Sequence, residues 1–479
     1  MIDLQELVNK NVPFKFSGAE LRLDLSHALF SSYDVDVGTR LLLKTVARDP
    51  ALSGARRVLD EGCGVGVIGL AAAKAFPGAE LLLRDRDSLA AAFAERNRLA
   101  NRLRGSPERT DPATGEHRPA RPAPRVGLGL LAAGYGGETF DYVLSNLPAK
   151  AGAPVLEAFF AQAGSTEPSR SFLAPGGRLA VVIVHTLAEA AAQWIDKAGL
   201  RVVETGRGSM HRVFVVERAP SGASAVASSE APAGAPAEAP AGAPAEAPAG
   251  ASAGAGPDAA AAARAEASAE VPAGARAEAS GERLPSGGGP YLDLGGLDLS
   301  AYVRRQGRFV LGEVSYQARG FWGLPEFDTV SYGSDAAASL GERVLAGSRP
   351  REVLIVNPGL GHLALWAARR LRPAAITGAS RDLLSLAATA SNLAAAGGVA
   401  YRAADALRLD ELPEASLDLI LETPDLVPSF DWAALCWARA GRLVKAGGTY
   451  LAVCPPTEAG RLEKRRLPGW RLLGERRKR

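Results

Sequence analysis

Four segments of this chain occur twice, in the same order. Residues 56–76, RRVLDEGCGVGVIGLAAAKAF, resemble residues 351–371, REVLIVNPGLGHLALWAARRL. Three further pairs follow: 85–103 with 380–398, 140–148 with 417–425, and 173–185 with 444–456. Because both copies carry the same pattern, each must build the same supersecondary units around a core of its own. A chain of 479 residues is long enough for two such cores.

Strand-like and helix-like runs alternate in both copies. In the first copy the strand run 56–62 precedes a helix run at 67–76, and the strand run 79–85 precedes a helix run at 88–101. This alternation predicts an α/β class, with a mainly parallel sheet covered by helices on both faces. We therefore expect two doubly wound domains of one design.

Residues 219–289 lie between the two copies and differ from them in composition. Their central part, APAGAPAEAPAGAPAEAPAGASAGAG, contains no large apolar side chain. Such a segment buries too little surface to offset the entropy that is lost when a chain becomes ordered. We predict a disordered Ala/Pro/Gly/Glu-rich linker at 219–289, which joins a domain at 1–218 to a domain at 290–479.

Charge, cysteine content and hydropathy argue against several classes of protein. The net charge of +3 is only mildly basic, so it permits a nucleic-acid partner without indicating one. The cysteines Cys63, Cys436 and Cys454 are far apart and predict neither a zinc site nor a disulfide framework. We therefore expect no metal. No run approaches 18 apolar residues, so we also expect no membrane span and a cytoplasmic location.

A glycine-rich turn follows the first strand of the first copy. In VLDEGCGVGVIGL, Asp60 ends the strand, and Gly62, Gly64 and Gly66 let the backbone turn tightly and approach a ligand closely. The helix that follows presents free N–H groups to a polar ligand. The spacing is D-x-G-x-G-x-G, whereas dinucleotide sites carry G-x-G-x-x-G. This spacing favours S-adenosylmethionine over a dinucleotide as the ligand.

Asp85 ends the next strand, about twenty residues after the glycine turn. A carboxylate at that position accepts hydrogen bonds from both ribose hydroxyls of a bound nucleoside. Asp87 is the alternative, although the register of the strand favours Asp85.

The stretch DYVLSNLPAKAG, residues 141–152, reads as a buried strand that runs directly into Asn146, Leu147 and Pro148. Ligands of open α/β sheets gather at such strand ends. The amide oxygen of Asn146 and the carbonyl of Leu147 are able to accept hydrogen bonds from one amine, which aims its lone pair at a methyl donor. Pro148 fixes the turn that orients this carbonyl.

These three elements, in this order, resemble the small-domain family of class I S-adenosylmethionine-dependent methyltransferases. The family includes the ribosomal RNA small-subunit guanine-N2 methyltransferases. The resemblance covers residues 14–218 and includes the segment SSYDVDVGTRLLLKTV. There Asp36, Gly38 and Thr39 match a D-x-G-T/S segment that lies beside the cofactor in the family. The resemblance implies a Rossmann-like methyltransferase domain, with Asp36 and Gly38 in its S-adenosylmethionine site.

The family's Asn-Pro-Pro-aromatic tetrapeptide takes a variant form here. The first proline is Leu147, and the aromatic residue is Ala149, which removes a stacking surface for a base. Some relatives carry an aliphatic residue followed by a basic one, as Ala149 and Lys150 do here. The resemblance therefore implies a non-standard but active site, with Lys150 as a contact to the substrate.

The second copy departs further from the pattern, and we predict that it is degenerate and non-catalytic. In its turn, NPGLGH, we read Asn357 in place of the strand-end acid and His362 in place of the third glycine. Ser380 replaces Asp85, the carboxylate expected to bind the ribose, and Glu422-Thr423-Pro424 replaces the Asn-Leu-Pro tripeptide. Asp405 is the only familiar acid left. His362, like His185 and His211, stands alone and is expected to be structural.

The resemblance implies methyl transfer to an exocyclic amine, with guanine N2 of ribosomal RNA as the favoured substrate and ribosomal RNA or a ribosomal subunit as the partner. Two alternatives stay open: methylation of a protein glutamine amide, and an RNA-binding pseudoenzyme. The tail at 461–479 is rich in Lys and Arg and carries Trp470, so we expect it to contact RNA phosphates together with the second copy.

Overall fold

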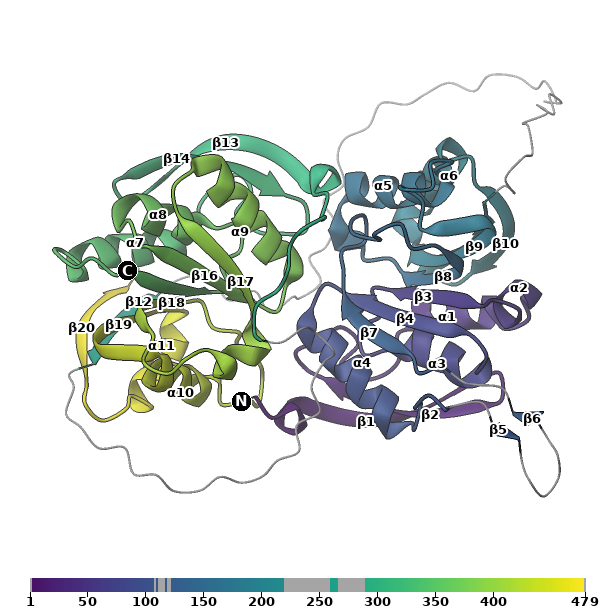
Figure 1. Ribbon diagram of the computed structural model, residues 1–479, viewed down its shortest axis with the longest axis horizontal. Helices are drawn as coiled ribbons and strands as arrows, with labels where there is room; N and C mark the ends of the chain where they lie inside the picture. Colours follow the sequence, from purple (N-terminus) through teal and green to yellow (C-terminus); the bar gives the residue numbers. More distant parts are fainter. Residues whose placement is uncertain are drawn as a thin grey trace.

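The computed structural model describes residues 2–106, 122–218 and 289–477, together with the backbone of three short strands between them. These strands are β5 (Arg109–Thr110), β6 (His117–Arg118) and β12 (Ala259–Ala265). Two seven-stranded sheets, one from each copy, form two lobes that lie side by side (Figure 1). Helices cover both faces of each sheet, and the predicted α/β class with two Rossmann-like domains is confirmed.

The first sheet has the strand order β10-β11-β9-β8-β3-β4-β7. Its strands are β3 (Arg57–Glu61), β4 (Glu80–Asp85), β7 (Arg125–Leu128), β8 (Phe140–Asn146), β9 (Leu173–Val184), β10 (Arg201–Arg207) and β11 (His211–Glu217). All neighbours are parallel except β11, which is antiparallel to β9 and β10. The sheet grows outward from β3 in both directions, so the crevice at the carboxyl ends of β3 and β8 is where a ligand is expected.

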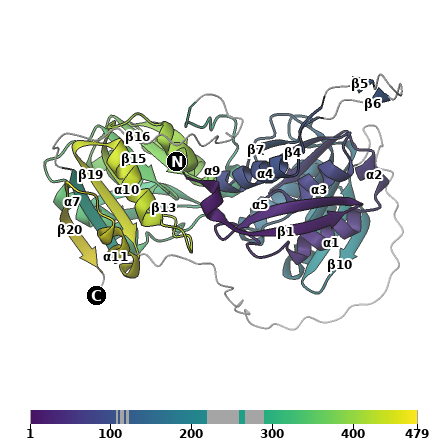
Figure 2. The ribbon, with the colours of Figure 1, turned by 90° about the horizontal axis from the view of Figure 1, so that it is seen from below.

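One face of the first sheet is covered by a hairpin and three helices, and the other by two helices (Figures 1 and 2). The first group is β1 (Val8–Phe16), β2 (Ala19–Ser26), α1 (Val37–Val46), α3 (Val67–Ala75) and α4 (Ser88–Ala100). The second group is α5 (Ala153–Gly164) and α6 (Ala188–Lys197). Short elements connect them: α2 (Pro50–Ser53), η1 (Leu4–Leu7), η2 (Ala149–Ala151) and η3 (His185–Leu187). Small apolar residues let α3 pack tightly, and seven of its nine residues are buried.

The second sheet has the order β17-β16-β15-β18-β19-β12-β20. Its strands besides β12 are β15 (Glu352–Val356), β16 (Ala375–Ser380), β17 (Ala400–Asp405), β18 (Leu417–Glu422), β19 (Val444–Cys454) and β20 (Trp470–Arg477). One face carries β13 (Val303–Leu311), β14 (Val314–Phe321), α7 (Tyr332–Val344), α8 (His362–Arg370) and α9 (Leu383–Ala396). The other carries α10 (Trp432–Leu443), α11 (Pro456–Lys464) and the turn η5 (Ala406–Glu411), while η4 (Ser300–Tyr302) precedes β13.

The duplication extends to single hydrogen bonds. Asn97 on α4 ties the hairpin to the helix: its Nδ2 donates to the Asp24 carbonyl at 3.1 Å, and its Oδ1 accepts from the Asp24 N–H at 2.7 Å. Asn392 on α9 makes the same two bonds to Arg319 of the second hairpin, at 3.0 and 2.8 Å. The two copies therefore share one way of fastening their hairpins to their sheets.

The predicted linker contains one described element, which is a departure from the expectation. Strand β12 lies between β19 and β20 and is antiparallel to both. In the first sheet β11 has the same place and direction between β9 and β10. Main-chain pairing alone adds a strand to a sheet, so an alanine-rich segment suffices. The remainder of the predicted linker lies outside the described residues.

The two lobes meet through the loops that follow β4 and β16, which are equivalent in the two copies. The Ser88 N–H donates to the Arg381 carbonyl at 2.9 Å, and the Leu383 N–H donates to the Arg86 carbonyl, also at 2.9 Å. The bonds are reciprocal, as in the interface of a two-fold symmetric dimer. The duplicated copies therefore pack like two subunits of one dimer.

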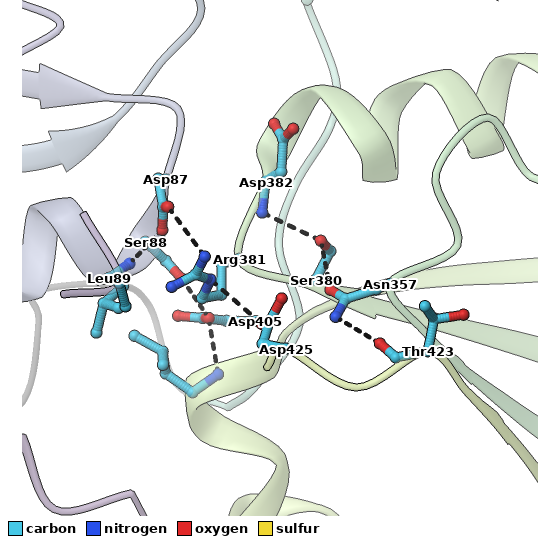
Figure 3. A network of polar contacts seen from close by, with 12 residues as sticks. Asp87, Ser88, Leu89, Asn357, Ser380, Arg381, Asp382, Asp405, Thr423 and Asp425 are labelled. Carbon is cyan, nitrogen blue, oxygen red and sulfur yellow. Dashed lines mark hydrogen bonds and ion pairs between the residues drawn. The ribbon is translucent and has the colours of Figure 1, made fainter. Parts of the chain in front are cut away.

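Side chains repeat this reciprocity across the interface. The Arg86 guanidinium lies 3.2 Å from the Asp382 carboxylate. The Arg381 guanidinium lies 3.6 Å from the Asp87 carboxylate (Figure 3). Arg381 also pairs with Asp425 at 3.3 Å. Because Arg381 is 21% exposed, water screens these pairs only in part.

The interface pairing makes a prediction about stability. Arg381→Ala leaves two carboxylates without their cation, so it is expected to lower the free energy of unfolding by about 1–3 kcal/mol. Arg402→Ala is the matched control, because Arg402 pairs with Glu352 at the surface and is 43% exposed; there the loss is expected to stay below about 1 kcal/mol. Urea unfolding followed by circular dichroism measures both. Equal losses in the two variants would contradict the role given to Arg381.

Candidate active site

The glycine-rich turn joins β3 to α3 at the carboxyl edge of the first sheet. Gly62, Gly64 and Gly66 have φ angles of 74°, 55° and 89°, a region that glycine enters without strain. A Cβ at Gly66 would lie 2.9 Å from the side chain of Leu70. The three glycines predicted as ligand contacts are thus required by the shape of the turn.

Asp85, at the end of β4, is bound to this turn. Its Oδ2 accepts a hydrogen bond from the Gly64 N–H at 2.9 Å, and its Oδ1 accepts one from the Asp87 N–H at 2.9 Å. Asp87, the alternative, instead caps α4 by accepting from the Leu89 N–H at 2.8 Å, and pairs with Arg381. The structure therefore brings Asp85, and not Asp87, to the glycine turn.

Asp60, at the end of β3, is fully buried beside the turn. Its Oδ2 accepts a hydrogen bond from the Gly69 N–H at 2.7 Å, whereas its Oδ1 has no partner among the described residues. Burial raises the pKa of Asp60 to about 7 and that of Asp85 to about 6. A buried carboxylate oxygen without a partner in the protein is open to a donor from a ligand or a water molecule.

Gly69 and Arg84 belong to this region and were not foreseen from the sequence. A Cβ at Gly69 would lie 2.9 Å from Asp60 Oδ2, so only glycine lets α3 come this close to β3. On the opposite face of the sheet, the buried Glu61 pairs with Arg84 at 3.1 Å. Gly69 is the fourth glycine of VLDEGCGVGVIGL, and this was the available signal for it. The ion pair between Glu61 and Arg84 has no signature in the spacing of the sequence.

Asp60 makes the stability of the protein depend on pH. Its pKa in the folded protein, about 7, lies above the value of about 4 in the unfolded chain. The favourable contribution of this carboxyl to the free energy of unfolding is therefore fully present below pH 4 and is lost as the pH rises through 7. Relative to wild type, Asp60→Asn should gain roughly 2–4 kcal/mol in unfolding free energy between pH 4 and pH 8. Denaturant unfolding at several pH values measures this gain.

The exposed Asp34 supplies the control for this prediction. The Val35 N–H, with Arg40, lowers the pKa of Asp34, so this carboxyl, unlike Asp60, does not titrate near neutral pH in the folded protein. Asp34→Asn should therefore keep a constant offset from wild type over the same range. A constant offset for Asp60→Asn as well would show that Asp60 ionises at ordinary pH.

Asn146, the last residue of β8, is held by two groups at the start of α1. Its Nδ2 donates to Asp36 Oδ2 at 3.0 Å and to Thr39 Oγ1 at 3.1 Å. A carboxylate only accepts hydrogen bonds, so the amide nitrogen must face Asp36 and the amide oxygen must face away from it. The Asn146 oxygen is thereby presented as an acceptor in a fixed direction.

Asp36 and Gly38, which were predicted in the cofactor site, support Asn146 in this structure. Asp36 caps α1 by accepting from the Thr39 N–H at 3.1 Å with the same oxygen that holds Asn146. A Cβ at Gly38 would lie 2.8 Å from Asp36 Oδ2 and 3.0 Å from the ring of His211. The lone His211 thus lies beside the segment that orients Asn146, and its Nδ1 is buried without a partner among the described residues.

Leu147, Pro148 and Lys150 leave the strand as a short turn. The Leu147 N–H donates to the Val182 carbonyl at 3.0 Å and its side chain is buried, whereas Pro148 and Lys150 are exposed. Among the described residues, no hydrogen bond to the Leu147 carbonyl is present. The carbonyl of Leu147 and the amide oxygen of Asn146 therefore form two free acceptors at the same strand end.

The structure corrects the register of the second glycine turn. Asn357, Gly359 and Gly361 have φ angles of 56°, 58° and 87°, which match those of Gly62, Gly64 and Gly66. Asn357 thus replaces the first glycine and not the strand-end acid, because asparagine tolerates positive φ. The third glycine is retained as Gly361. The counterpart of Asp60 is Ile355.

The register at the end of β18, the counterpart of the strand end that carries Asn146, also shifts by one residue. Asp141 Oδ2 accepts from the N–H groups at the start of β3, and Asp418 Oδ2 accepts from those at the start of β15. These equivalent aspartates place Thr423, and not Glu422, at the position of Asn146. The second copy therefore lacks an amide at the strand end.

The remaining polar groups of the second site bond to one another. Ser380 Oγ donates to Asn357 Oδ1 at 3.1 Å, and Asn357 Nδ2 donates to the Thr423 carbonyl at 2.9 Å (Figure 3). Asp405, the acid of the second copy that the sequence analysis singled out, accepts a hydrogen bond from Ser88 Oγ of the first copy at 2.7 Å. This carboxylate therefore takes part in the contact between the two copies.

A small pocket of the second copy lies at the carboxyl ends of β15 and β18. It is bordered by apolar residues of the first copy, namely Ile2, Leu7 and Leu89. The first copy therefore covers part of this edge of the second sheet.

Other predicted residues have structural partners. His362 is buried, with Nδ1 2.9 Å from Tyr316 Oη and Nε2 3.1 Å from the Glu326 carbonyl. In the basic tail, Trp470 packs edge-on against Trp437, with 5.3 Å between ring centroids. Arg461, Arg465 and Arg466 each pair with a carboxylate. Much of the tail is thus engaged with the protein itself.

Across residues 2–106, 122–218 and 289–477, no group of three or more His, Cys, Asp or Glu side chains is arranged to hold a metal ion. In the same part of the chain, no helix is both long and apolar enough to cross a bilayer.

Residues 20–117 match a family described as the methyltransferase small domain. Ribosomal RNA large subunit methyltransferase G of Streptomyces coelicolor is 36% identical over 164 residues, which are 33% of this chain and 36% of that protein. Ribosomal RNA small subunit methyltransferase C of Vibrio vulnificus is 42% identical over 88 residues, 18% of this chain and 24% of that protein. Each match spans well under half of the relative's own length.

Among solved structures, the T. thermophilus 16S rRNA N2 G1207 methyltransferase, in complex with AdoMet and guanosine, has a similar fold. The TM-score is 0.54 at 19% identity, over 99% of this chain and 100% of that one. This likeness concerns the fold alone. Residues 20–117 therefore match the methyltransferase small-domain family, and the chain as a whole shares the fold of this 16S rRNA methyltransferase.

Proposed function

We propose that the first copy is an S-adenosylmethionine-dependent methyltransferase that acts on an exocyclic amine, namely N2 of a guanine in ribosomal RNA. The observation that carries the proposal is the fixed orientation of Asn146. Asp36 and Thr39 hold its amide nitrogen, so its oxygen stands ready as an acceptor next to the Leu147 carbonyl. Two acceptors at one strand end suit the two hydrogens of a primary amine.

The residues around the glycine turn fit this cofactor. Asp85 would accept from the ribose hydroxyls, and the unpartnered Oδ1 of Asp60 would accept a hydrogen bond from the ligand. The three glycines of the turn would let the methionine part approach the backbone. When bound, S-adenosylmethionine supplies a methyl group on a positively charged sulfur, and two nearby carboxylates favour that charge.

Asn146 and Leu147 would position the amine for attack. Each of their oxygens would accept a hydrogen bond from one N–H of the amine, and this would turn the nitrogen lone pair toward the methyl carbon. The nitrogen–carbon bond would form as the carbon–sulfur bond breaks, and positive charge would grow on the nitrogen that Asn146 and Leu147 hold. Both hydrogen bonds strengthen at that moment, so they stabilise the transition state more than the ground state. The nitrogen then loses one proton to solvent.

The choice of guanine in RNA rests on the relatives. Two of them are named as ribosomal RNA methyltransferases, and the similar solved structure was determined with guanosine. The exposed Lys150, on the turn after Asn146, would contact the RNA backbone.

We assign no catalysis to the second copy, whose place in the chain is 290–479, beyond the linker at 219–289 and the catalytic domain at 1–218. Ile355 and Ser380 replace the two acids Asp60 and Asp85, and Thr423 replaces the amide of Asn146. The Ser380 hydroxyl and the Thr423 carbonyl both bond to Asn357. Its contribution would be to pack against the loop that follows Asp85.

Transfer of a labelled methyl group to deproteinised ribosomal RNA tests the proposal. We expect label in RNA, recovered as N2-methylguanosine after digestion. Asn146→Ala should lower kcat on the order of 100-fold, because it removes one of the two acceptors, with the affinity for the cofactor little changed. Thr423→Ala, the counterpart in the second copy, is the matched control and should retain full activity.

Other outcomes would contradict parts of the proposal. Label in ribosomal protein and none in RNA would replace the substrate by a protein amide. Full activity of Asn146→Ala with loss in Thr423→Ala would move catalysis to the second copy. RNA binding without any transfer by the wild-type chain would identify a pseudoenzyme.

A further inference from the structure

The four most exposed large hydrophobic side chains of the described residues all belong to the first copy. Phe30, Met210, Tyr33 and Val37 are 76%, 68%, 66% and 64% exposed, more than any other large apolar residue in that part of the chain. Exposed apolar clusters of this kind mark binding surfaces more often than scattered single residues do.

All four lie on segments that adjoin the pair formed by Asp36 and Asn146. Phe30 and Tyr33 belong to the segment between β2 and α1, which ends at Asp36, and Val37 is the first residue of α1. Met210 precedes His211, whose ring flanks the backbone of Gly38. The Gly208 backbone in the same turn faces the side chain of Leu41 on α1. The apolar cluster thus borders the strand end where the amine would be placed.

The aromatic segment is held in position. Asn9 Nδ2 donates to the Ser32 carbonyl at 2.7 Å, and Arg40 donates to Asp34 at 2.8 Å. The ring of Tyr33 packs edge-on against His27, with 5.3 Å between centroids. Among the described residues, the ring of Phe30 meets no other aromatic ring. The two rings are therefore presented to solvent by an anchored backbone.

Cationic side chains accompany these rings. Lys150 and Arg207 are exposed near the same edge, on the turn after Asn146 and at the end of β10. Neither pairs with a carboxylate among the described residues, whereas Arg40 is occupied by Asp34. Free aromatic faces next to unpaired cations are the features with which proteins hold single-stranded nucleic acid.

These exposed rings also supply an aromatic surface that the turn after Asn146 lacks. The residue that follows Pro148 is Ala149, which offers no ring against which a base might stack. We infer that Phe30 and Tyr33 form a stacking platform for unpaired bases of the RNA strand that enters the first site. This inference rests on the proposed function and names the residues that would select single-stranded RNA at that site.

The test uses the full chain with Phe30→Ala, Tyr33→Ala and the double variant. The probe is a fluorescent single-stranded RNA oligonucleotide that contains guanosine, and binding is followed by anisotropy. Loss of a stacking ring should weaken RNA binding and raise the KM for RNA about 5- to 100-fold, with little change in kcat and none in cofactor affinity. Phe30→Trp should restore binding, because it keeps an aromatic face.

Tyr291→Ala is the matched control, since Tyr291 is an exposed aromatic residue of the second copy. It should leave RNA binding unchanged. Unchanged RNA binding in the Phe30 and Tyr33 double variant would overturn the platform. A loss of cofactor affinity with RNA affinity intact would also overturn it, because the rings would then cover the cofactor. RNA binding that depends on Phe30 in a chain that transfers no methyl group would support the platform while refuting the proposed activity.

Discussion

The loops that follow β4 and β16 bind each other, and the arrangement of the two copies depends on this contact. In this fold the strand before the loop ends at the position of the ribose acid, so the contact brings the carboxyl edges of the two sheets together. Arg86 and Arg381 each pair with an aspartate of the other loop. Apolar residues of the first copy then border the corresponding edge of the second. The carboxyl edge of the second sheet is partly covered by the first copy, whereas the carboxyl edge of the first sheet retains the polar groups of the candidate site.

The two copies differ in the side chain that is buried beside the glycine turn. The first keeps Asp60 buried, with one oxygen unpartnered and a pKa raised to about 7, which destabilises the folded chain at neutral pH. The second has Ile355 in that place and bonds its asparagine, serine and threonine groups to one another. A buried aspartate oxygen without a partner among the described residues is therefore present beside the first glycine turn and absent beside the second. This contrast between copies of one fold is the physical reason to assign the activity to the first.

Much of this architecture follows from the sequence, because strand-helix alternation and glycine spacing are local patterns. The sheets, the glycine turn and the position of Asp85 on it are of this kind. The register of the second turn was predicted wrongly, because Asn357 occupies a left-handed conformation that the pattern assigns to glycine. Strand β12 has no side-chain pattern and forms through main-chain pairing. The bond between Asp36 and Asn146 joins residues 110 positions apart, a distance over which spacing carries no information.

The central claim is that one copy of the duplicated fold holds the cofactor and the other does not. Isothermal titration of S-adenosylmethionine into the full chain measures this directly through its stoichiometry. The account predicts one molecule bound per chain, with binding abolished by Asp85→Ala and unaffected by Ser380→Ala at the equivalent position of the second copy. Two molecules per chain, or binding that survives Asp85→Ala and disappears in Ser380→Ala, would contradict it.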